Sequence, residues 1–274
     1  MGKRKGEEDR LAVDVHRSRS GWKQTMDRSA LVTFSDQLRE ARENALRDSE
    51  AFDNIIHVVE RLGSYLCGRI TNLGDYKKKI QESASNSALS DDIPSQRPDV
   101  HIPFSMLYEL VREARNDALH QGAFARRLTD HAIELSLVLE DALRRSLDYP
   151  VVGDYMVRTP TCAEQWQPIS FIRQQMLANS FSFLPVKWAT EWWLVSDLEI
   201  AGYLGTETKE RKHRLVQTLE TAGIPLQHAK LCAVDTPLET ALRMMAGEQR
   251  PLLVCATAED SQALVGIITP FDLL

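Results

Sequence analysis

The 274-residue chain lacks several features that would place it in a class at once. No apolar run approaches the roughly 20 residues that span a bilayer, and residues 1–10 are too charged for a signal peptide. Basic residues are outnumbered, 33 Lys and Arg against 39 Asp and Glu, which gives a net charge of −6. A general nucleic-acid coat protein would be basic, so this class is excluded, whereas a local basic site is not. We expect a cytoplasmic protein with no membrane contact.

Cysteine is scarce, and the widely separated thiols form no CxxC pair: Cys67, Cys162, Cys232 and Cys255. No histidine stands at zinc-ligand spacing from them, so we expect small buried side chains in a reducing compartment, without disulfides and without a metal site. The chain also has no Walker phosphate loop and no GxGxxG, HExxH or GxSxG motif. These absences exclude the enzyme classes that depend on those motifs.

The pattern of the chain changes near residue 149, and its length suits two domains. Residues 1–27 mix charges without periodicity and predict a mobile tail. Residues 28–148 carry apolar side chains at steps of three and four, which predicts an all-α bundle of about four helices. We expect one helix over 51–69, a loop over 83–100, a helix from Pro103 to Gly122, and a helix to about residue 147.

Residues 149–274 predict an α/β module, because short apolar runs alternate with helices. The module repeats with a period of about 70 to 75 residues, since each pair of runs follows a helix rich in Met and Leu. We expect a first unit at 149–205, a linker helix at 206–224 and a second unit at 225–274. The expected strands lie at 183–186, 192–195, 252–255 and 264–268, and the expected helices at 169–177 and 238–245.

Two motifs in this module resemble a tandem CBS-domain pair. The sequence Val-Val-Gly-Asp-Tyr-Met at 151–156 resembles the start of the first unit, and Gly-x-x-Thr-x-x-Asp at 266–272 resembles the end of the second. The resemblance implies that Thr269 helps to hold a phosphate and that Asp272 accepts hydrogen bonds from ribose hydroxyls. An ionised carboxylate is an acceptor-only group and suits two donors. An adenine nucleotide (ATP, ADP or AMP) is therefore the implied regulator. The chain ends where a terminal helix of such a unit would begin, so a trimmed second unit is implied.

The first unit departs from this pattern, because Ser196 and Glu199 stand at the two nucleotide-binding positions. Glutamate is longer than aspartate by one methylene, which changes its reach toward a ribose. Three tryptophans lie near the hairpin that precedes these residues: Trp188, Trp192 and Trp193. They can stack on an adenine or pack in a core. A structural pair that only dimerises is the alternative to nucleotide binding.

The helical part carries Arg115-Asn116-x-x-x-His120, which resembles the core motif of HEPN domains, many of which are metal-independent ribonucleases. Asn116 and His120 lie four residues apart on one helix face, with Arg115 about 100° to the side. Histidine transfers protons near neutral pH, and arginine stabilises charge on a phosphate. RNA supplies its own 2′-hydroxyl nucleophile, so catalysis needs no cofactor. The resemblance also implies a homodimer with one composite cleft.

Our leading hypothesis is therefore a homodimeric endoribonuclease, regulated by an adenine nucleotide, with a role in stress or phage defence. A second hypothesis is a non-catalytic nucleotide sensor whose helical domain dimerises or docks a partner. A third is a HEPN toxin controlled by a nucleotidyltransferase-type antitoxin. The simpler interpretation of the motif also stays open: His120 suits a helix C-terminus through the macrodipole, and Arg115 suits a solvated surface. The basic runs at 77–79 and 126–127 can guide RNA or simply face solvent.

Overall fold

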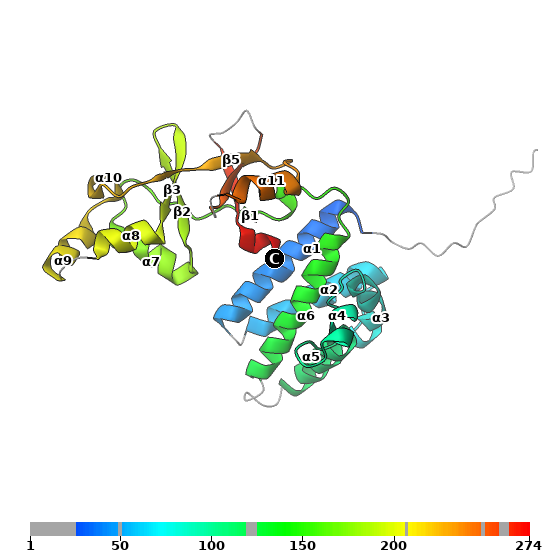
Figure 1. Ribbon diagram of the computed structural model, residues 1–274. Coiled ribbons are helices and arrows are strands. Elements are labelled where there is room, and N and C mark those ends of the chain that lie inside the picture. Colours follow the sequence, from blue (N-terminus) through cyan, green and yellow to red (C-terminus); the bar gives the residue numbers. More distant parts are fainter. Residues whose placement is uncertain (1–25, 49–50, 119–124, 206–207, 248–249, 258–262) are drawn as a thin grey trace, which may run out of the picture.

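The computed structural model describes residues 26–48, 51–118, 125–205, 208–247, 250–257 and 263–274 (Figure 1). Within these ranges the first part of the chain is helical, and the second part mixes helices with two sheets. This arrangement agrees with the expected multidomain order of a helical part followed by an α/β part. Among the described helices, none is long and apolar enough to cross a membrane. The expected tail, residues 1–27, lies almost entirely outside the described residues.

The helical part contains these helices: α1 (Arg28–Arg47), α2 (Phe52–Cys67), α3 (Leu73–Ala84), α4 (Asp92–Gln96), α5 (Phe104–Ala118) and α6 (Ala125–Arg145). The sequence predicts about four helices and a loop over 83–100; the described residues form six helices here, and the short helix α4 lies within the expected loop. Local signals explain two of the additional boundaries. Gly68 ends α2 in the left-handed region at φ 65°, and the side chain of Asn72 caps α3 by accepting from the Asp75 amide. The Gly122 expected to close α5 lies outside the described residues.

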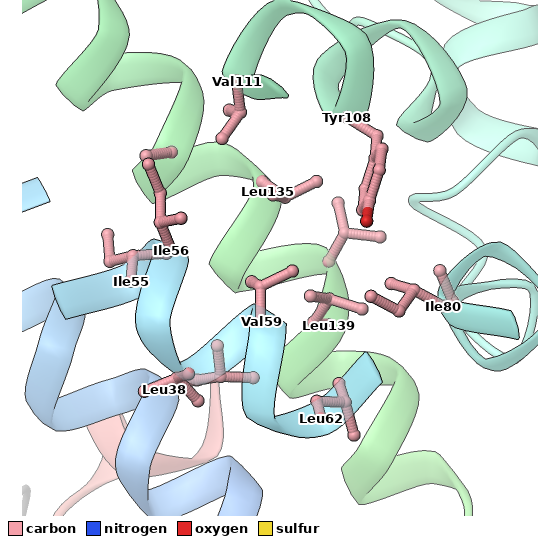
Figure 2. Packing of buried hydrophobic residues seen from close by; sticks show 14 of the residues in the cluster. Leu38, Ile55, Ile56, Val59, Leu62, Ile80, Tyr108, Val111, Leu135 and Leu139 are labelled. Atoms are coloured by element: carbon pink, nitrogen blue, oxygen red, sulfur yellow. The ribbon is translucent and has the colours of Figure 1, made fainter. Parts of the chain in front are cut away.

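One apolar core holds the helices together. Figure 2 shows Leu38 of α1, Ile55 and Leu62 of α2, Ile80 of α3 and Leu139 of α6 meeting in its centre, and each is fully buried. Complete burial of such a side chain stabilises the fold by about 1.5–3 kcal/mol relative to leaving it exposed. The spacing of three and four residues that predicted the helices is therefore the spacing that builds this core.

A buried ion pair also joins α1 to α6. Arg42 Nε donates to Glu140 Oε1 at 2.9 Å, and Arg42 Nη2 donates to Glu140 Oε2 at 3.2 Å. Burial alone would lower the pKa of Arg42, but the hydrogen bond and charge of Glu140 outweigh it and raise that pKa. Both carboxylate oxygens of Glu140 are thus engaged by one guanidinium group.

The α/β module begins with the 3₁₀ turn η2 (Val152–Asp154). Its first unit contains β1 (Val157–Arg158), α7 (Ile169–Asn179), β2 (Phe183–Trp188), β3 (Glu191–Ser196) and α8 (Asp197–Leu204). Next come α9 (Thr208–Val216), α10 (Leu219–Ala222), β4 (Gln227–His228), β5 (Lys230–Ala233), α11 (Leu238–Met245), β6 (Leu252–Cys255), β7 (Leu264–Ile268) and the 3₁₀ turn η3 (Pro270–Leu273). The predicted strands at 252–255 and 264–268 and the helix at 238–245 are confirmed.

The two units exchange their first strands. β1 of the first unit pairs with β7 in the order β1-β7-β6-β5, and β4 at the start of the second unit pairs with β3 in the order β2-β3-β4. Gly266 permits this exchange, because a Cβ there would lie 2.5 Å from Met156 Sδ and 3.1 Å from the main-chain oxygen of Val157. The structure thus explains why glycine suits this position of the Gly-x-x-Thr-x-x-Asp motif: the absence of a Cβ lets β1 approach β7.

The segment expected as one linker helix holds α9 and α10, and it packs on the first unit. The Leu219 amide donates to the Gln167 carbonyl at 3.0 Å, and Leu219 joins the cluster of Ile169 and Ile172. A turn ends α9 after Val216, and Thr218 then caps α10. The segment is thus part of the first unit's core and does more than connect the units.

All four cysteines are free thiols. Burial raises the pKa of Cys162 to about 11 and that of Cys232 to about 11. Such thiols are neutral at physiological pH and behave as small apolar side chains, as expected from their scarcity and spacing.

Candidate functional site

The predicted pair Thr269 and Asp272 meets in the turn that ends the second unit. The Asp272 Oδ2 atom accepts from the Thr269 amide and from Thr269 Oγ1, both at 2.8 Å. This reciprocal capping arrangement holds η3 at the end of β7, and Asp272 is 8% exposed. The motif spacing thus brings a hydroxyl and a carboxylate to one short turn.

The same turn contacts the helical part, which the sequence did not predict. Arg39 Nη1 of α1 lies 3.4 Å from Asp272 Oδ1, and Arg144 Nη1 of α6 donates to the Asp272 carbonyl at 3.2 Å. Figure 1 shows the C-terminal end of the chain lying against α1. The candidate site is therefore located where the α/β module and the helical bundle meet.

Arginines on one face of α1 hold the module in place. Arg28 pairs with Asp154 of η2 and donates to the Asp148 carbonyl at 2.8 Å. Arg39, eleven residues later, lies on nearly the same face because 11 residues make about three turns of an α-helix. It donates to the Tyr155 carbonyl at 2.8 Å and pairs with Asp36 at 2.8 Å. Hydrogen bonds from charged donors are stronger than neutral ones, so these contacts anchor the module on α1.

Arg144 occupies a different environment from Arg39. Its guanidinium carbon lies 4.9 Å from the ring centroid of Tyr155, a cation–π contact. Burial, with a further contribution from the charge of Arg39, lowers the pKa of Arg144 below its usual value. Its Nε and Nη2 atoms are buried and have no hydrogen-bond partner among the described residues. No sequence signal pointed to Arg144, since an arginine near the end of a helix ordinarily faces solvent.

The corresponding pair in the first unit is arranged differently. Ser196 is buried, and its Oγ caps α8 by accepting from the Glu199 amide at 3.1 Å. The two residues are therefore brought together through the Glu199 main chain, whereas Thr269 and Asp272 meet through their side chains. The serine hydroxyl accepts in a helix cap here, while the Thr269 hydroxyl donates to a carboxylate.

The tryptophans near the first unit's hairpin have packing partners. Trp192 belongs to an apolar cluster between the two sheets, with Lys187 Nζ lying 5.7 Å from its ring centroid. Trp193 packs edge-on against the His228 ring at 5.1 Å, and Trp188 packs against the first unit's core. Core packing therefore accounts for the positions of Trp188 and Trp192, whereas Trp193 is half-buried and contacts an exposed histidine.

A hollow of about 480 Å³ opens on the first unit between α7, α8 and α9. Its lining includes the exposed Leu177 and Leu198 together with Arg173 and Arg211. Neither Ser196 nor Glu199 lines it. The hollow is thus a separate surface feature and does not contain the predicted nucleotide-binding pair.

The predicted ribonuclease residues are described only in part. Arg115 lies on α5 and forms an ion pair with Glu60 of α2. The main chain of Asn116 is helical, the side chain of Asn116 is not among the described features, and His120 lies outside the described residues. The structure therefore places Arg115 beside a carboxylate, and the geometry of the three residues as a group lies outside what it describes.

Two of the three lysines at 77–79, which were expected to guide RNA, are paired with carboxylates. Lys77 pairs with Glu109, whose pKa is lowered by that hydrogen bond, and Lys79 pairs with Glu82 at 2.8 Å. Within the part of the chain that the structure describes, no group of three metal-ligating side chains is assembled. Acidic partners thus neutralise part of the positive charge near α5.

No protein-family model and no curated protein matches the chain. Solved structures do resemble part of it. CBSX2 from Arabidopsis thaliana is 20% identical over 46% of this chain and 92% of its own, with a TM-score of 0.37. The CBS-domain pair of protein MJ0100 is 17% identical over 46% of this chain and 94% of its own, also at 0.37. AcuB from Vibrio cholerae is 21% identical over 46% of this chain and 88% of its own, at 0.38.

Proteins with a CBS-domain pair thus resemble about 46% of the chain, and a share of this size corresponds to the two α/β units. Identities below 25% and TM-scores below 0.5 leave the functional argument to the chain's own residues, above all to the contacts around Asp272.

Proposed function

We propose that the chain is a sensor of adenine nucleotides. The α/β module binds the nucleotide at Thr269 and Asp272, and the helical bundle responds to its presence. One observation carries this proposal: the turn that holds both residues is in direct contact with Arg39 of α1 and Arg144 of α6. A ligand on this turn cannot bind without altering those contacts.

The ligand class follows from the two side chains and is consistent with the structural neighbours. The Asp272 carboxylate can accept two ribose hydroxyls, and the Thr269 hydroxyl can donate to a phosphate oxygen. Among the neighbours, CBSX2 was determined with AMP, and the MJ0100 pair with 5′-methylthioadenosine and S-adenosyl-L-methionine. Each of these ligands contains adenosine, which supports an adenine nucleoside portion as the common element.

Sensing requires that the ligand bind one arrangement of the two parts better than another. In the structure, Asp272 Oδ2 is occupied by Thr269, whereas Asp272 Oδ1 has only the 3.4 Å contact with Arg39. A ribose must compete for these oxygens. Binding therefore changes the contact between η3 and Arg39 of α1, and through Arg39 it affects the helical bundle.

The test is calorimetric titration of the full chain with ATP, ADP and AMP. Asp272→Asn keeps the size of the side chain and removes the charge, so we expect the affinity to fall at least tenfold. Asp154→Asn is the matched control, since Asp154 also caps a 3₁₀ turn and also pairs with an arginine of α1. The proposal is wrong if no adenine nucleotide binds the wild-type chain, or if both variants bind as the wild type does.

A second proposal is metal-independent cleavage of RNA by Arg115, Asn116 and His120 in a homodimer. It is supported by the position of Arg115 and Asn116 at the end of α5 in a helical bundle, with His120 four residues after Asn116. The nucleotide proposal has more direct support, because the contacts of Asp272 are described. Incubation with RNA in EDTA tests the second one: the wild type should leave cyclic-phosphate ends, and His120→Ala should leave the RNA intact.

A further inference from the structure

Arg144 has hydrogen-bonding capacity that the protein does not use. A guanidinium group offers five N–H donors in a fixed fork. In Arg144 the Nη1 atom donates to the Asp272 carbonyl, while Nε and Nη2 are buried and have no partner among the described residues. Leaving buried charged donors unpaired is unfavourable in free energy. A negatively charged acceptor that bound both Nε and Nη2 would remove this penalty.

The carboxylates beside Arg144 and beside the neighbouring Arg39 are already engaged by other groups. Both oxygens of Glu140 bind Arg42. Asp36 Oδ1 accepts from Arg39, and Asp36 Oδ2 lies 3.5 Å from Arg158 Nε.

Asp272 Oδ2 accepts twice from Thr269, and Asp272 Oδ1 faces Arg39. The Tyr155 ring contributes only its π face to Arg144. Among the described residues, Arg144 is therefore a positive charge whose hydrogen bonds include no carboxylate.

The position of Arg144 identifies the class of acceptor. Its one main-chain bond is to the turn that carries Thr269, the residue proposed to face a phosphate. The Nε and Nη2 edge of a guanidinium group binds two oxygens of a phosphate side by side, in the geometry that makes arginine the preferred phosphate ligand. A phosphate on this turn would supply the negative oxygens that the surrounding carboxylates do not.

We propose that Arg144 of the helical bundle is the phosphate-binding residue of the nucleotide site, so that the site is composite and selects phosphate-bearing adenine nucleotides over adenosine. This inference rests on the proposed nucleotide function and adds a ligand from outside the α/β module. Asp272 holds the ribose of the ligand, and Arg144 joins Thr269 on its anionic side.

The burial of Arg144 links this binding to a change between the two parts. Its free donors are closed off from solvent in the structure, between α6, the Tyr155 ring and η3. A phosphate reaches them only when the guanidinium leaves the Tyr155 ring or when α6 separates from the turn. Binding of a phosphate thus requires a change in the contact between α6 and the turn, whereas binding of adenosine at Asp272 changes only the contact with Arg39 of α1.

The experiment compares AMP with adenosine by calorimetry on the full chain. For the wild type we expect AMP to bind about 10- to 100-fold more tightly than adenosine, the range of one charge-assisted bidentate contact. Arg144→Gln should bind AMP and adenosine with similar affinities, with its adenosine affinity unchanged. Arg144→Lys should keep part of the preference, because it keeps the charge and loses the fork. Arg145→Gln, the same change at the next residue, should behave as the wild type, since Arg145 is exposed and pairs with Asp141.

The outcomes separate this inference from the proposed function. If the wild type binds neither compound, the nucleotide proposal and the inference both fail. If the wild type prefers AMP and Arg144→Gln keeps that preference, the inference fails, Arg144 is a packing residue of the interface, and the nucleotide proposal stands. Melting curves show whether each variant folds. If Arg144→Gln does not fold, the preference of Arg144→Lys for AMP over adenosine tests the inference, because lysine has a similar length.

Discussion

Arg144 Nη1 of helix α6 lies 3.2 Å from the main-chain oxygen of Asp272, the last residue of the motif that ends the second α/β unit. Together with the contact between Arg39 and Asp272, this bond makes the candidate nucleotide site part of an interface. Ligand binding at the turn and docking of the helical bundle both use atoms of Asp272. We therefore expect ligand binding to change the strength of the docking, and docking to change the ligand affinity.

The hydroxyl of Thr269 gives the first prediction. Thr269→Val removes the 2.8 Å bond to Asp272 Oδ2 but leaves the main-chain amide bond in place. We expect a loss of about 1 kcal/mol in the free energy of unfolding and a roughly tenfold loss in AMP affinity. Thr236→Val is the control, because the Thr236 hydroxyl accepts from the Ala233 amide in another turn of the second unit. Equal AMP affinities in the two variants would contradict the assigned role.

The docking of the module on α1 gives the second prediction. Arg28→Ala with Arg39→Ala removes the charged contacts to Asp154 and to the Tyr155 carbonyl. We expect the interface to weaken by about 2–5 kcal/mol, and calorimetric unfolding to separate into two transitions. Arg47→Ala, on the exposed end of the same helix, should leave one transition. A single unchanged transition in the double variant would show that these arginines do not hold the two parts together.

The buried pair of Arg42 and Glu140 gives the third prediction. Removing one partner leaves the other as an uncompensated buried charge, so Arg42→Ala should lower the free energy of unfolding by about 3–5 kcal/mol. The pair of Arg145 and Asp141 is more exposed, and Arg145→Ala should cost less than about 1 kcal/mol. Urea denaturation of the two variants measures both values. Similar losses in the two variants would mean that burial of the Arg42–Glu140 pair does not increase its contribution to the free energy of unfolding.

The buried thiols give a prediction about pH. Because burial raises the pKa of Cys162 and of Cys232 to about 11, each is protonated at neutral pH and becomes a thiolate only as the pH rises. About one molecule in a thousand carries the reactive thiolate at pH 8, and the alkylation rate should increase about tenfold per pH unit up to pH 10. Mass spectrometry of iodoacetamide-treated peptides measures this rate. A rate that levels off near pH 9 would contradict the raised pKa values.

The sequence predicted those elements whose signal is local. The apolar runs at 252–255 and 264–268 are β6 and β7, and the spacing of the motif brought Thr269 to Asp272. The strands β1 and β4 are two residues long, and only exchange between the units defines them. A stretch of this length carries no periodicity, so it could not be predicted from the sequence.

The interface residues could not be predicted for a different reason. Arg39 and Arg144 lie on amphipathic helices at polar positions, and in sequence a polar position on a helix indicates a solvated face. Only the docking of the α/β module buries these positions, and that docking depends on contacts between residues more than 100 positions apart. The ribonuclease motif differs from both. The spacing of its residues is evident in the sequence, and their arrangement in space stays a prediction.

Hydrogen exchange of the full chain with and without saturating AMP tests whether a ligand on η3 changes the helical bundle. We expect slower exchange in η3, which holds the ligand, together with altered exchange in α1 around Arg39 and in α6 around Arg144. Asp272→Asn should abolish all three changes. Unchanged exchange in η3, α1 and α6 at saturating AMP would show that the chain does not sense this nucleotide through the turn at Thr269 and Asp272.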